Sequence, residues 1–393
     1  DLYVVSGGNE ARDGDSLLAD HFYINDGRGR FALSHTVPVL LKNKSCVASA
    51  DIDKDGDQDL FVGGLADSRL YGIPQSSYLL LNDGKAGFSK AGRGVIDLDS
   101  LGITTSGAFT DLNKDGWMDL VVTGEWMPVK IFINKEGTFK ENDIPQSTGM
   151  WQTIFPADVN GDGITDLLAG NWGLNTKLAA GKDGPLKLYV KNFDNQGGIE
   201  QIMTYTIKGE EYTFLAKDEL ERPLPVLKKH YLTYKEVAGK TVQYMLFDLF
   251  KDYIELKAEN LASTCFLGDG KGGFRKVALP TPLQLAPIFA FSQVAPGSGN
   301  TFLAGGNFYG VIPYEGRYDA LLPTTFAFNG QKGGFESTGS LAITEGEVRD
   351  VKWVATATGE PILAVGRNNR PLLFLRPSKK PQTAIAKSST TRK

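Results

Sequence analysis

Cysteine and histidine are scarce in this chain of 393 residues. It contains the cysteines Cys46 and Cys265 and three scattered histidines, His21, His35 and His230. Two cysteines cannot supply a disulfide framework, and free cysteine is commonly buried, so we expect two free interior thiols, with one long-range bridge as the alternative. Three scattered histidines are too few for a histidine-based zinc site.

Long apolar runs and an excess of basic charge are also missing. No run of about 18 apolar residues exists, which excludes a transmembrane helix and membrane insertion. With 42 basic and 46 acidic residues, the net charge of −4 argues against a nucleic-acid partner and an electrostatic membrane anchor. The GxSxG, HExxH and P-loop signatures are absent as well. An enzyme is therefore not the favoured interpretation, although a calcium-dependent polysaccharide lyase or hydrolase stays an alternative.

What the chain does contain is repeats. An acidic loop occurs as DIDKDGDQDLFVGG, DLNKDGWMDLVVTGEW and DVNGDGITDLLAGNW, starting at residues 51, 111 and 158. A glycine-rich hairpin that ends in phenylalanine recurs five times, for example LLNDGKAGF at residues 80–88. Short β-like runs with turn signals and a period near 50 residues are typical of propeller blades. We predict an all-β fold, a seven-bladed β-propeller over residues 1–376.

Two segments depart from the repeat pattern. Residues from about 215 to 251 have helix formers with apolar spacings of three and four, which predicts one helical insertion. The tail over 377–393 is rich in Ser, Thr, Lys and Pro and is predicted to be disordered. Asp1-Leu2-Tyr3-Val4 aligns with Asp59-Leu60-Phe61-Val62, so we expect Asp1 at the ninth position of an acidic loop. A longer polypeptide that continues upstream is the corresponding expectation.

The acidic loops predict calcium binding. Carboxylate or amide oxygens at positions 1, 3, 5 and 9, with a backbone carbonyl at position 7, converge on one point, and such oxygen sets suit Ca²⁺ better than Mg²⁺. An EF-hand would need a glutamate at position 12, where Val62, Val122 and Ala169 stand. The predicted ligands of the three loops are Asp51, Asp53, Asp55, Asp57 and Asp59; Asp111, Asn113, Asp115, Trp117 and Asp119; and Asp158, Asn160, Asp162, Ile164 and Asp166.

A fourth copy of the loop is weaker. It begins at residue 192 and offers only two formal charges among its oxygen ligands, so metal binding there is left open. The residues concerned are Asn192, Asp194, Gln196 and Glu200.

The DxDxDGxxDL loop followed by a VGG-like strand resembles the FG-GAP or VCBS repeat, the blade unit of integrin α-subunit propellers. The order of DLYVVSGGNE, GEWMPV, GNWGLN and KDELERPLPVLKKHY is similar to the repeat regions of bacterial proteins that carry a domain related to cartilage acidic protein (ASPIC/UnbV). The resemblance spans residues 1 to about 376. It implies a seven-bladed, calcium-binding, extracytoplasmic propeller, which would be secreted, periplasmic or on the cell surface.

The connections between the second and third strands of the blades form the candidate ligand face. Consecutive strands run antiparallel, so these connections lie opposite the acidic loops. Aromatic rings beside amides suit a glycan or a protein partner. We therefore expect a partner-binding module of a longer surface protein, with a scaffold that has no ligand as the alternative. The candidate ligand residues are Glu125, Trp126, Asn171, Trp172, Asn307, Tyr309 and Arg367.

Overall fold

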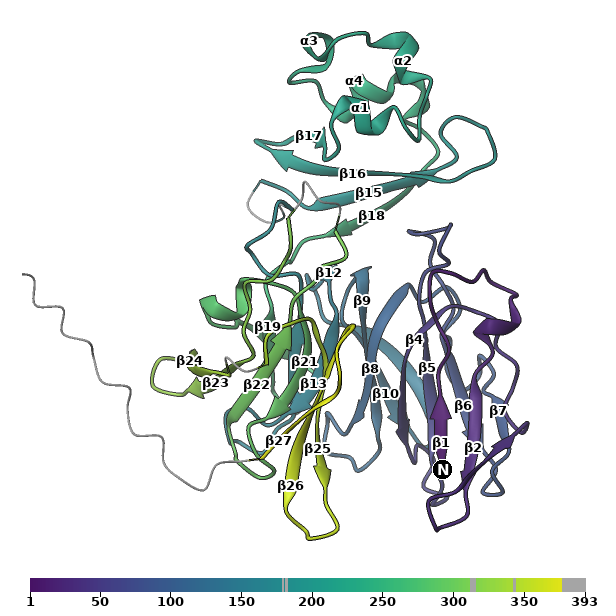
Figure 1. Ribbon diagram of the computed structural model, residues 1–393, viewed down its shortest axis with the longest axis vertical. Coiled ribbons are helices and arrows are strands. Elements are labelled where there is room, and N and C mark those ends of the chain that lie inside the picture. Colours follow the sequence, from purple (N-terminus) through teal and green to yellow (C-terminus); the bar gives the residue numbers. More distant parts are fainter. Residues whose placement is uncertain (179, 181–182, 312–315, 342–343, 377–393) are drawn as a thin grey trace, which may run out of the picture.

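The computed structural model confirms an all-β protein (Figure 1). It describes residues 1–178, 180, 183–311, 316–341 and 344–376, so the predicted tail at 377–393 lies outside the described residues. The described residues form seven sheets, and every strand pairing in them is antiparallel. None of their helices is long and apolar enough to cross a bilayer. Both cysteines are free; Cys265 is buried and Cys46 is half-buried.

Six of the sheets follow one another along the chain, and five of these contain a glycine-rich hairpin, which joins the last two strands of the sheet or, in sheet three, β10 and β11. The first three are sheet one, β1 (Leu2–Val4), β2 (His21–Asn25) and β3 (Phe31–Ser34); sheet two, β4 (Lys44–Ala50), β5 (Asp59–Gly64), β6 (Tyr78–Asn82) and β7 (Phe88–Lys90); and sheet three, β8 (Ile103–Thr110), β9 (Asp119–Met127), β10 (Lys130–Lys135), β11 (Thr138–Asp143) and the short β12 (Gly149–Met150). The others are sheet four, β13 (Thr153–Ala157), β14 (Asp166–Gly170), β19 (Thr264–Gly268) and β20 (Phe274–Ala278); sheet five, β21 (Ile288–Gln293), β22 (Thr301–Gly306), β23 (Thr324–Asn329) and β24 (Gly334–Ser340); and sheet six, β25 (Val348–Ala355), β26 (Pro361–Arg367) and β27 (Leu373–Leu375). Two short 3-10 turns, Ser16–Leu18 and Thr281–Gln284, lie in the connections.

The first strands of sheets two to six stand side by side around a channel of about 700 Å³. These are β4, β8, β13, β21 and β25. Small residues such as Ala48 and Gly107 line the channel, whereas the next strand outward is buried on both faces and reads as a continuous apolar run. Leu60, Leu120 and Leu167 are at most 7 % exposed for that reason.

The seventh sheet belongs to an insertion between β14 and β19. We call residues 186–258 the inserted lobe; in Figure 1 it stands at the top of the molecule. Its helices fall within the predicted segment 215–251, but they pack on a sheet of their own that the sequence analysis did not separate. Because one of the seven sheets lies in this insertion, seven blades in a ring are not confirmed. The lobe consists of β15 (Leu186–Lys191), β16 (Glu200–Ile207), β17 (Glu210–Thr213) and β18 (Ile254–Ala258), the helices α1 (Lys217–Leu220), α2 (Leu227–His230), α3 (Tyr234–Val237) and α4 (Val242–Leu246), and the 3-10 turn η2 (Phe247–Leu249).

The lobe has two hydrophobic interfaces. On one face of its sheet, Tyr189 and Ile202 pack against helical residues such as Leu227 and Met245. The other interface faces sheets two and three, where Leu186, Leu188, Val190 and Ala258 pack with Ala66, Ile103, Trp126 and Met150. The lobe is therefore held on the end of the sheets that lies opposite the acidic loops.

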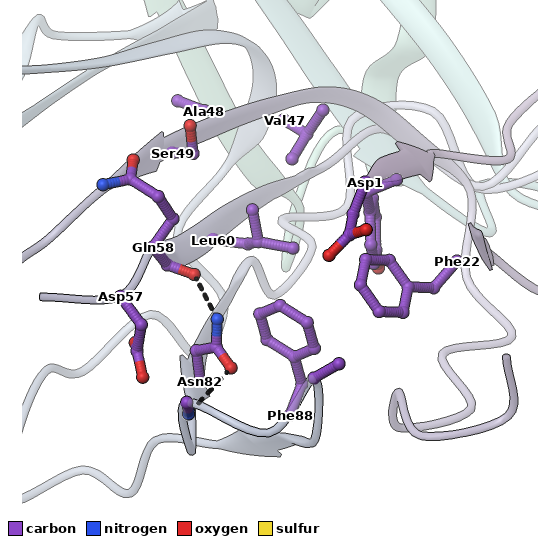
Figure 2. A pocket seen from close by; sticks show the side chains of 13 residues that line it. Asp1, Phe22, Val47, Ala48, Ser49, Asp57, Gln58, Leu60, Asn82 and Phe88 are labelled. Atoms are coloured by element: carbon purple, nitrogen blue, oxygen red, sulfur yellow. Dashed lines mark hydrogen bonds between the residues drawn. The ribbon is translucent and has the colours of Figure 1, made fainter. Parts of the chain in front are cut away.

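Sheets one and two enclose a groove of about 510 Å³ beside β1 (Figure 2). The ring of Phe22 stands edge-on to Phe88, with 5.3 Å between ring centroids. Val47 and Ser49 of β4 and Leu60 of β5 line the groove as well. The groove adjoins the channel at β4, because Val47 and Ala48 line both.

Candidate metal loops and the opposite face

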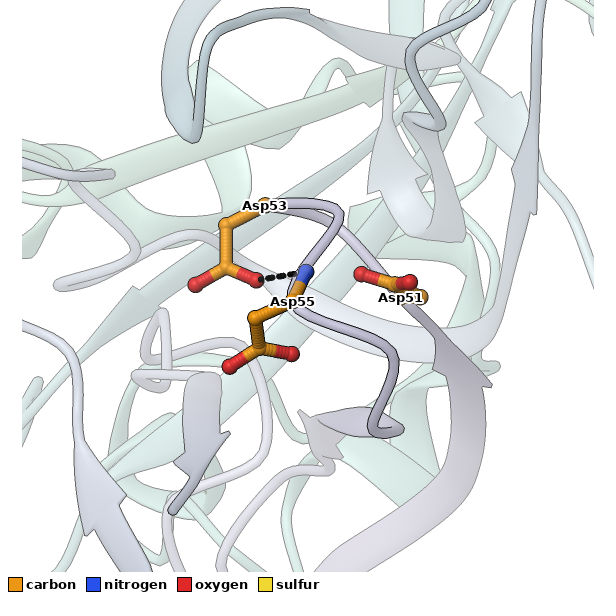
Figure 3. A group of neighbouring side chains, drawn as sticks. All are labelled: Asp51, Asp53 and Asp55. Atoms are coloured by element: carbon orange, nitrogen blue, oxygen red, sulfur yellow. Dashed lines mark hydrogen bonds between the residues drawn. The ribbon is translucent and has the colours of Figure 1, made fainter. Parts of the chain in front are cut away.

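Each of the three strong acidic loops joins the first strand of a sheet to the second. They connect β4 with β5, β8 with β9, and β13 with β14, so they lie at equivalent places in sheets two, three and four. In the first loop, carboxylate oxygens of Asp51, Asp53 and Asp55 all lie within 4.8 Å of one another (Figure 3). The structure thus brings three of the predicted carboxylates of the first loop together.

The backbone of each loop explains the repeated glycine. Position 6 is glycine with a positive φ, 97° at Gly56 and 81° at Gly116, a conformation that glycine adopts without steric cost. The N–H of this glycine donates to the carboxylate at position 1: 3.1 Å from Gly56 to Asp51 and 2.9 Å from Gly116 to Asp111. Gly163 makes the same bond at 2.8 Å in the third loop. The turn therefore folds the side chains at positions 1, 3 and 5 inward.

The aspartate at position 9 has a structural role that the sequence analysis did not predict. Asp119 is fully buried, and its two oxygens accept hydrogen bonds from Leu112 N in the loop (2.9 Å) and Asn134 N in the third strand (2.8 Å). Asp166 is bound in the same way by Val159 N (3.0 Å) and Gly268 N (2.8 Å). We call this pair of bonds the latch, because it ties the loop to a strand of the sheet.

The latch recurs in the first loop, and its strand-side bond recurs at Asp1. Asp59 accepts from Asn82 N at 2.9 Å and from Ile52 N at 3.3 Å. Asp1, which was expected at a ninth position, accepts from Asn25 N at 2.9 Å. Burial raises the pKa of Asp59 and of Asp119 to about 6, against the opposing effect of the backbone hydrogen bonds. No sequence signal distinguishes this role from that of a metal ligand, because the second donor comes from another strand.

Two carboxylate oxygens in the acidic loops receive no hydrogen bond, and this bears on whether a cation fits there. Asp111 Oδ1, at position 1 of the second loop, is buried and has no hydrogen-bond partner, and Asp57 Oδ1 in the first loop is in the same situation. A buried carboxylate oxygen without a donor is costly unless a cation or water contacts it. In the second and third loops, the amide at position 3 donates to the carboxylate at position 5: Asn113 to Asp115 at 2.8 Å and Asn160 to Asp162 at 2.9 Å. These oxygen sets fit a hard divalent cation.

The two non-acidic position-7 residues face their neighbours. The ring of Trp117 lies 3.9 Å beneath the ammonium of Lys54, which comes from position 4 of the first loop. Ile164 packs against Gly268 and Gly270 of the sheet-four hairpin. Both side chains therefore connect their loop to a neighbouring loop or hairpin. This is expected if only the backbone carbonyl at position 7 were available to a metal.

The fourth, weaker loop lies in the inserted lobe between β15 and β16. Its backbone repeats the same turn, with φ of 58° at Asn195 and 90° at Gly197. Glu200 accepts from Phe193 N at 2.7 Å, which reproduces the loop side of the latch. Asn192 Oδ1, at position 1, is buried without a hydrogen-bond partner, and Asp194 accepts from Gln196 N at 2.8 Å. The lobe's sheet is thus built around another copy of the same motif.

On the face opposite the acidic loops, the prediction that Trp126 forms an exposed stacking surface is wrong. Trp126 is only 5 % exposed, because the inserted lobe packs on it. Its Nε1 donates to Tyr71 Oη at 2.7 Å, and this hydroxyl donates to Glu125 Oε2 at 2.5 Å. Glu125 also accepts from Gln152 Nε2 at 3.0 Å. Trp126 and Glu125 therefore serve a partly buried polar network that seats the lobe, and Trp126 offers no open face to a ligand.

Asn171 and Asn307 are also buried. Asn171 Nδ2 donates to Asn260 O at 3.0 Å, across the base of the insertion. Asn307 Nδ2 donates to Leu321 O at 2.8 Å and to Gly346 O at 3.0 Å. These side-chain amides donate to backbone carbonyls, which explains why they follow the second strands of sheets four and five. Because they are buried, they cannot belong to an exposed ligand surface.

Trp172, Tyr309 and Arg367 remain half-buried. The Trp172 ring stands edge-on to Phe308 and Tyr318, with centroids 5.4 and 5.2 Å away. Arg367 donates to Glu345 O at 3.3 Å and to Pro371 O at 3.2 Å. Of the predicted ligand residues, these three and Glu125 retain some exposed surface.

Glu347 and Arg349 near Tyr309 were not singled out from the sequence. Glu347 is 5 % exposed and accepts from Arg349 Nη2 at 2.8 Å and from Tyr309 N at 2.8 Å. The Arg349 guanidinium lies 4.0 Å from the centroid of the Phe289 ring. One acid and one base two residues apart carry no recognisable sequence signal, since only the tertiary fold places Phe289 and Tyr309 beside them.

Comparison with known families gives one match. The model of the FG-GAP-like repeat matches residues 111–169, which run from the start of the second acidic loop through most of β14. The matched segment therefore contains both the second and the third acidic loops. No curated protein matches the chain. The geometry of the loops and this match agree, and the chain contains an FG-GAP-like repeat at residues 111–169.

Proposed function

We propose that the chain is an extracytoplasmic calcium-binding module whose six consecutive sheets are the blades of an FG-GAP β-propeller, as in integrin α-subunits. The carrying observation is the buried Asp111 Oδ1 with no hydrogen-bond partner, at the position equivalent to Asp51 in the first loop, where carboxylate oxygens of three aspartates lie within 4.8 Å of one another. Three copies of one loop design, each in an equivalent sheet, support a shared ligand. Calcium is the cation that such flexible sets of hard oxygen atoms accommodate best.

Calcium in this setting stabilises the fold rather than performing chemistry. Each loop joins two strands of one sheet, so a bound cation would hold positions 1, 3 and 5 together against the mutual repulsion of their carboxylates. Extracellular calcium modules typically bind at ~10⁻⁴–10⁻³ M, an affinity that suits a secreted, periplasmic or surface location. The enzyme alternative has no support in the loops, since their carboxylates are assigned to the cation and the latch.

The proposed partner is a protein or a glycan. The chain would bind it as one module of a longer surface protein. Burial of Trp126 removes the centre of the expected stacking surface and favours the second candidate, a scaffold without a ligand of its own. The partner surface that remains includes Tyr309, with the Arg317 guanidinium 5.1 Å from its ring centroid, and Arg367. A stacking ring beside cationic groups suits an acidic glycan or peptide.

Calorimetric titration of the EDTA-treated, dialysed chain with CaCl₂ tests the metal proposal. We expect one binding site to disappear in each of the variants Asp55→Asn, Asp115→Asn and Asp162→Asn. The matched control is Asp269→Asn, an exposed turn carboxylate that accepts only from backbone N–H groups of its hairpin. Asp194→Asn decides the fourth loop, because it changes the stoichiometry only if that loop binds. Equal melting temperatures in saturating Ca²⁺ and in excess EDTA would refute a stabilising metal.

A glycan array probed with and without EDTA tests the partner proposal. Binding that Tyr309→Ala abolishes, while the melting temperature is unchanged, supports the module. Absence of binding to glycans and to acidic peptides supports the scaffold. Depolymerised polysaccharide in the reaction mixture would instead identify the lyase or hydrolase alternative.

A further inference from the structure

The helical end of the inserted lobe presents a leucine to solvent. We call residues 228–240 the lobe tip; they run from α2 through α3 to the turn before α4, and α2 and α3 lie at the end of the lobe farthest from the six consecutive sheets (Figure 1). Leu232, between α2 and α3, is 79 % exposed, the largest fraction among the large apolar side chains of the described residues. Tyr234 of α3 and Tyr244 of α4 are exposed as well. Apolar and aromatic side chains gathered on a protruding end mark a candidate contact surface.

The fold holds Leu232 in this exposed position. The preceding residue, Tyr231, is buried in the lobe's core, and its Oη donates to Tyr244 O at 2.9 Å. On the other side, Thr233 N and Thr233 Oγ1 donate to Glu236 Oε2 at 2.7 and 3.2 Å, which caps α3. Leu232 therefore stands between two anchored residues, and its exposure follows from how the lobe packs.

The lobe tip is also basic. It contains four lysines and one glutamate, hence a net charge of +3 with His230 neutral, whereas the net charge of the whole chain is −4. The glutamate, Glu236, is engaged in the cap of α3. Lys240 Nζ lies 4.6 Å from the ring centroid of Tyr244, so a cation and an exposed ring stand together. All four lysines are exposed, and the lysine ion pairs formed among the described residues involve other lysines. The four are Lys228, Lys229, Lys235 and Lys240.

We propose that the lobe tip docks on the surface of an anionic lipid bilayer, with Leu232 between the headgroups and the lysines against their negative charges. Attraction of this kind grows with the apolar area buried and with the number of basic residues near the surface. The tyrosines suit the same depth, because their amphipathic rings favour the membrane–water interface. The contact is peripheral and needs no spanning helix. This inference goes beyond the calcium proposal and does not depend on it.

The shape of the tip favours a bilayer over an acidic protein segment. Leu232 protrudes from a bend between two short helices, and the apolar residues next to it in the fold, such as Leu227 and Tyr231, belong to the lobe's own core. A protein partner would have to supply a pocket for this side chain, whereas lipid headgroups part around it. Lysine side chains can lay their apolar stems along the interface and keep their ammonium groups among the headgroups. The acidic residues of α1 do not interfere, since α1 lies nearer the lobe's sheet than α2 and α3 do (Figure 1).

Co-sedimentation of the full chain with vesicles tests the proposal. In EDTA we expect the chain to pellet with vesicles of phosphatidylcholine mixed with phosphatidylglycerol, and to stay in the supernatant with phosphatidylcholine alone. Raising NaCl from about 0.05 M to about 0.5 M should release most of it, because exposed charges are then screened. Leu232→Ser should weaken binding roughly tenfold, through the apolar area that it removes. Leu17→Ser is the matched control, since Leu17 is 74 % exposed in the 3-10 turn of sheet one, outside the lobe.

Lys229→Glu is a second tip variant and should also weaken vesicle binding roughly tenfold. Its matched control is Lys85→Glu, an exposed lysine in the hairpin between β6 and β7, and circular dichroism shows whether each variant folds. Absence of vesicle binding would overturn the proposal, as would equal binding to uncharged vesicles or an equal loss in Leu17→Ser. Saturable binding to poly-glutamate but not to vesicles, abolished by Lys229→Glu, would assign the tip to an acidic protein and would likewise overturn it. Because EDTA is present throughout, none of these outcomes depends on calcium binding, so the two proposals fail separately.

Discussion

Replacing Asp119 by alanine separates the latch from metal binding. The carboxylate is fully buried and accepts from Leu112 N at 2.9 Å and Asn134 N at 2.8 Å. Its removal leaves both N–H groups without an acceptor, and each unsatisfied buried donor costs ~1–3 kcal/mol. We therefore expect Asp119→Ala to lower the free energy of unfolding by about 2–6 kcal/mol. Asp119→Asn keeps one acceptor oxygen and should lose about half of that.

Urea unfolding in excess EDTA is the assay, because it removes any contribution of calcium. The matched control is Asp83→Ala: Asp83 also accepts two backbone N–H bonds, from Lys85 at 2.8 Å and Gly87 at 2.9 Å, but it is exposed, so water replaces it. Asp115→Ala, which changes an exposed candidate ligand, should cost little in EDTA yet abolish stabilisation by calcium at its loop. A loss below about 1 kcal/mol for Asp119→Ala in EDTA would refute the latch.

Three further perturbations test other parts of the structure. Lys44→Met should lower the free energy of unfolding by about 3–5 kcal/mol in urea, because it leaves the fully buried Asp20 carboxylate, 3.3 Å away, without its cation; a loss below about 1 kcal/mol would contradict this. Trp126→Ala should loosen the inserted lobe and speed its limited proteolysis, with cleavage sites confined to the lobe; unchanged digestion would show that the lobe is held elsewhere. Burial raises the pKa of Cys46 from 9.0 to about 11, so its alkylation by iodoacetamide at pH 8 should be roughly a hundredfold slower than that of an ordinary thiol and should rise tenfold per pH unit up to about 11. Since the folded thiol holds its proton more tightly than the unfolded one, its contribution to stability is lost between pH 9 and 11; an alkylation rate that levels off near pH 9 would contradict the shift.

The local parts of the architecture could be predicted from the sequence. Alternating and apolar runs, acidic loops and glycine-rich hairpins depend on neighbouring residues, so the all-β class and the positions of the loops followed from them. The helical segment followed for the same reason. The positions of the oxygens at 1, 3 and 5 were also local, because Gly56 and its equivalents fold the loop on itself.

What the sequence did not predict depends on contacts between distant segments. The lobe's own sheet was missed because β18 pairs with β15 across the helices, more than sixty residues away. Trp126 and Trp172 looked equivalent, and both pack with the lobe's apolar residues, but Trp126 is buried whereas Trp172 is half-buried. The latch was missed because its second donor, such as Asn134 N, comes from a different strand.

The split of sheet four has a consequence for synthesis on the ribosome. β14 and its partner β19 are separated by roughly ninety residues, although Ala169 and Thr264 sit opposite each other in the finished sheet. At a translation rate of ~5–20 residues per second, the partner emerges about 5–20 s after β14. During that interval β14 presents an apolar edge, because Leu167, Leu168 and Ala169 are fully buried only in the complete sheet. Early folding of the inserted lobe would shorten the exposure of this edge by bringing β19 back beside β14 as soon as it is made.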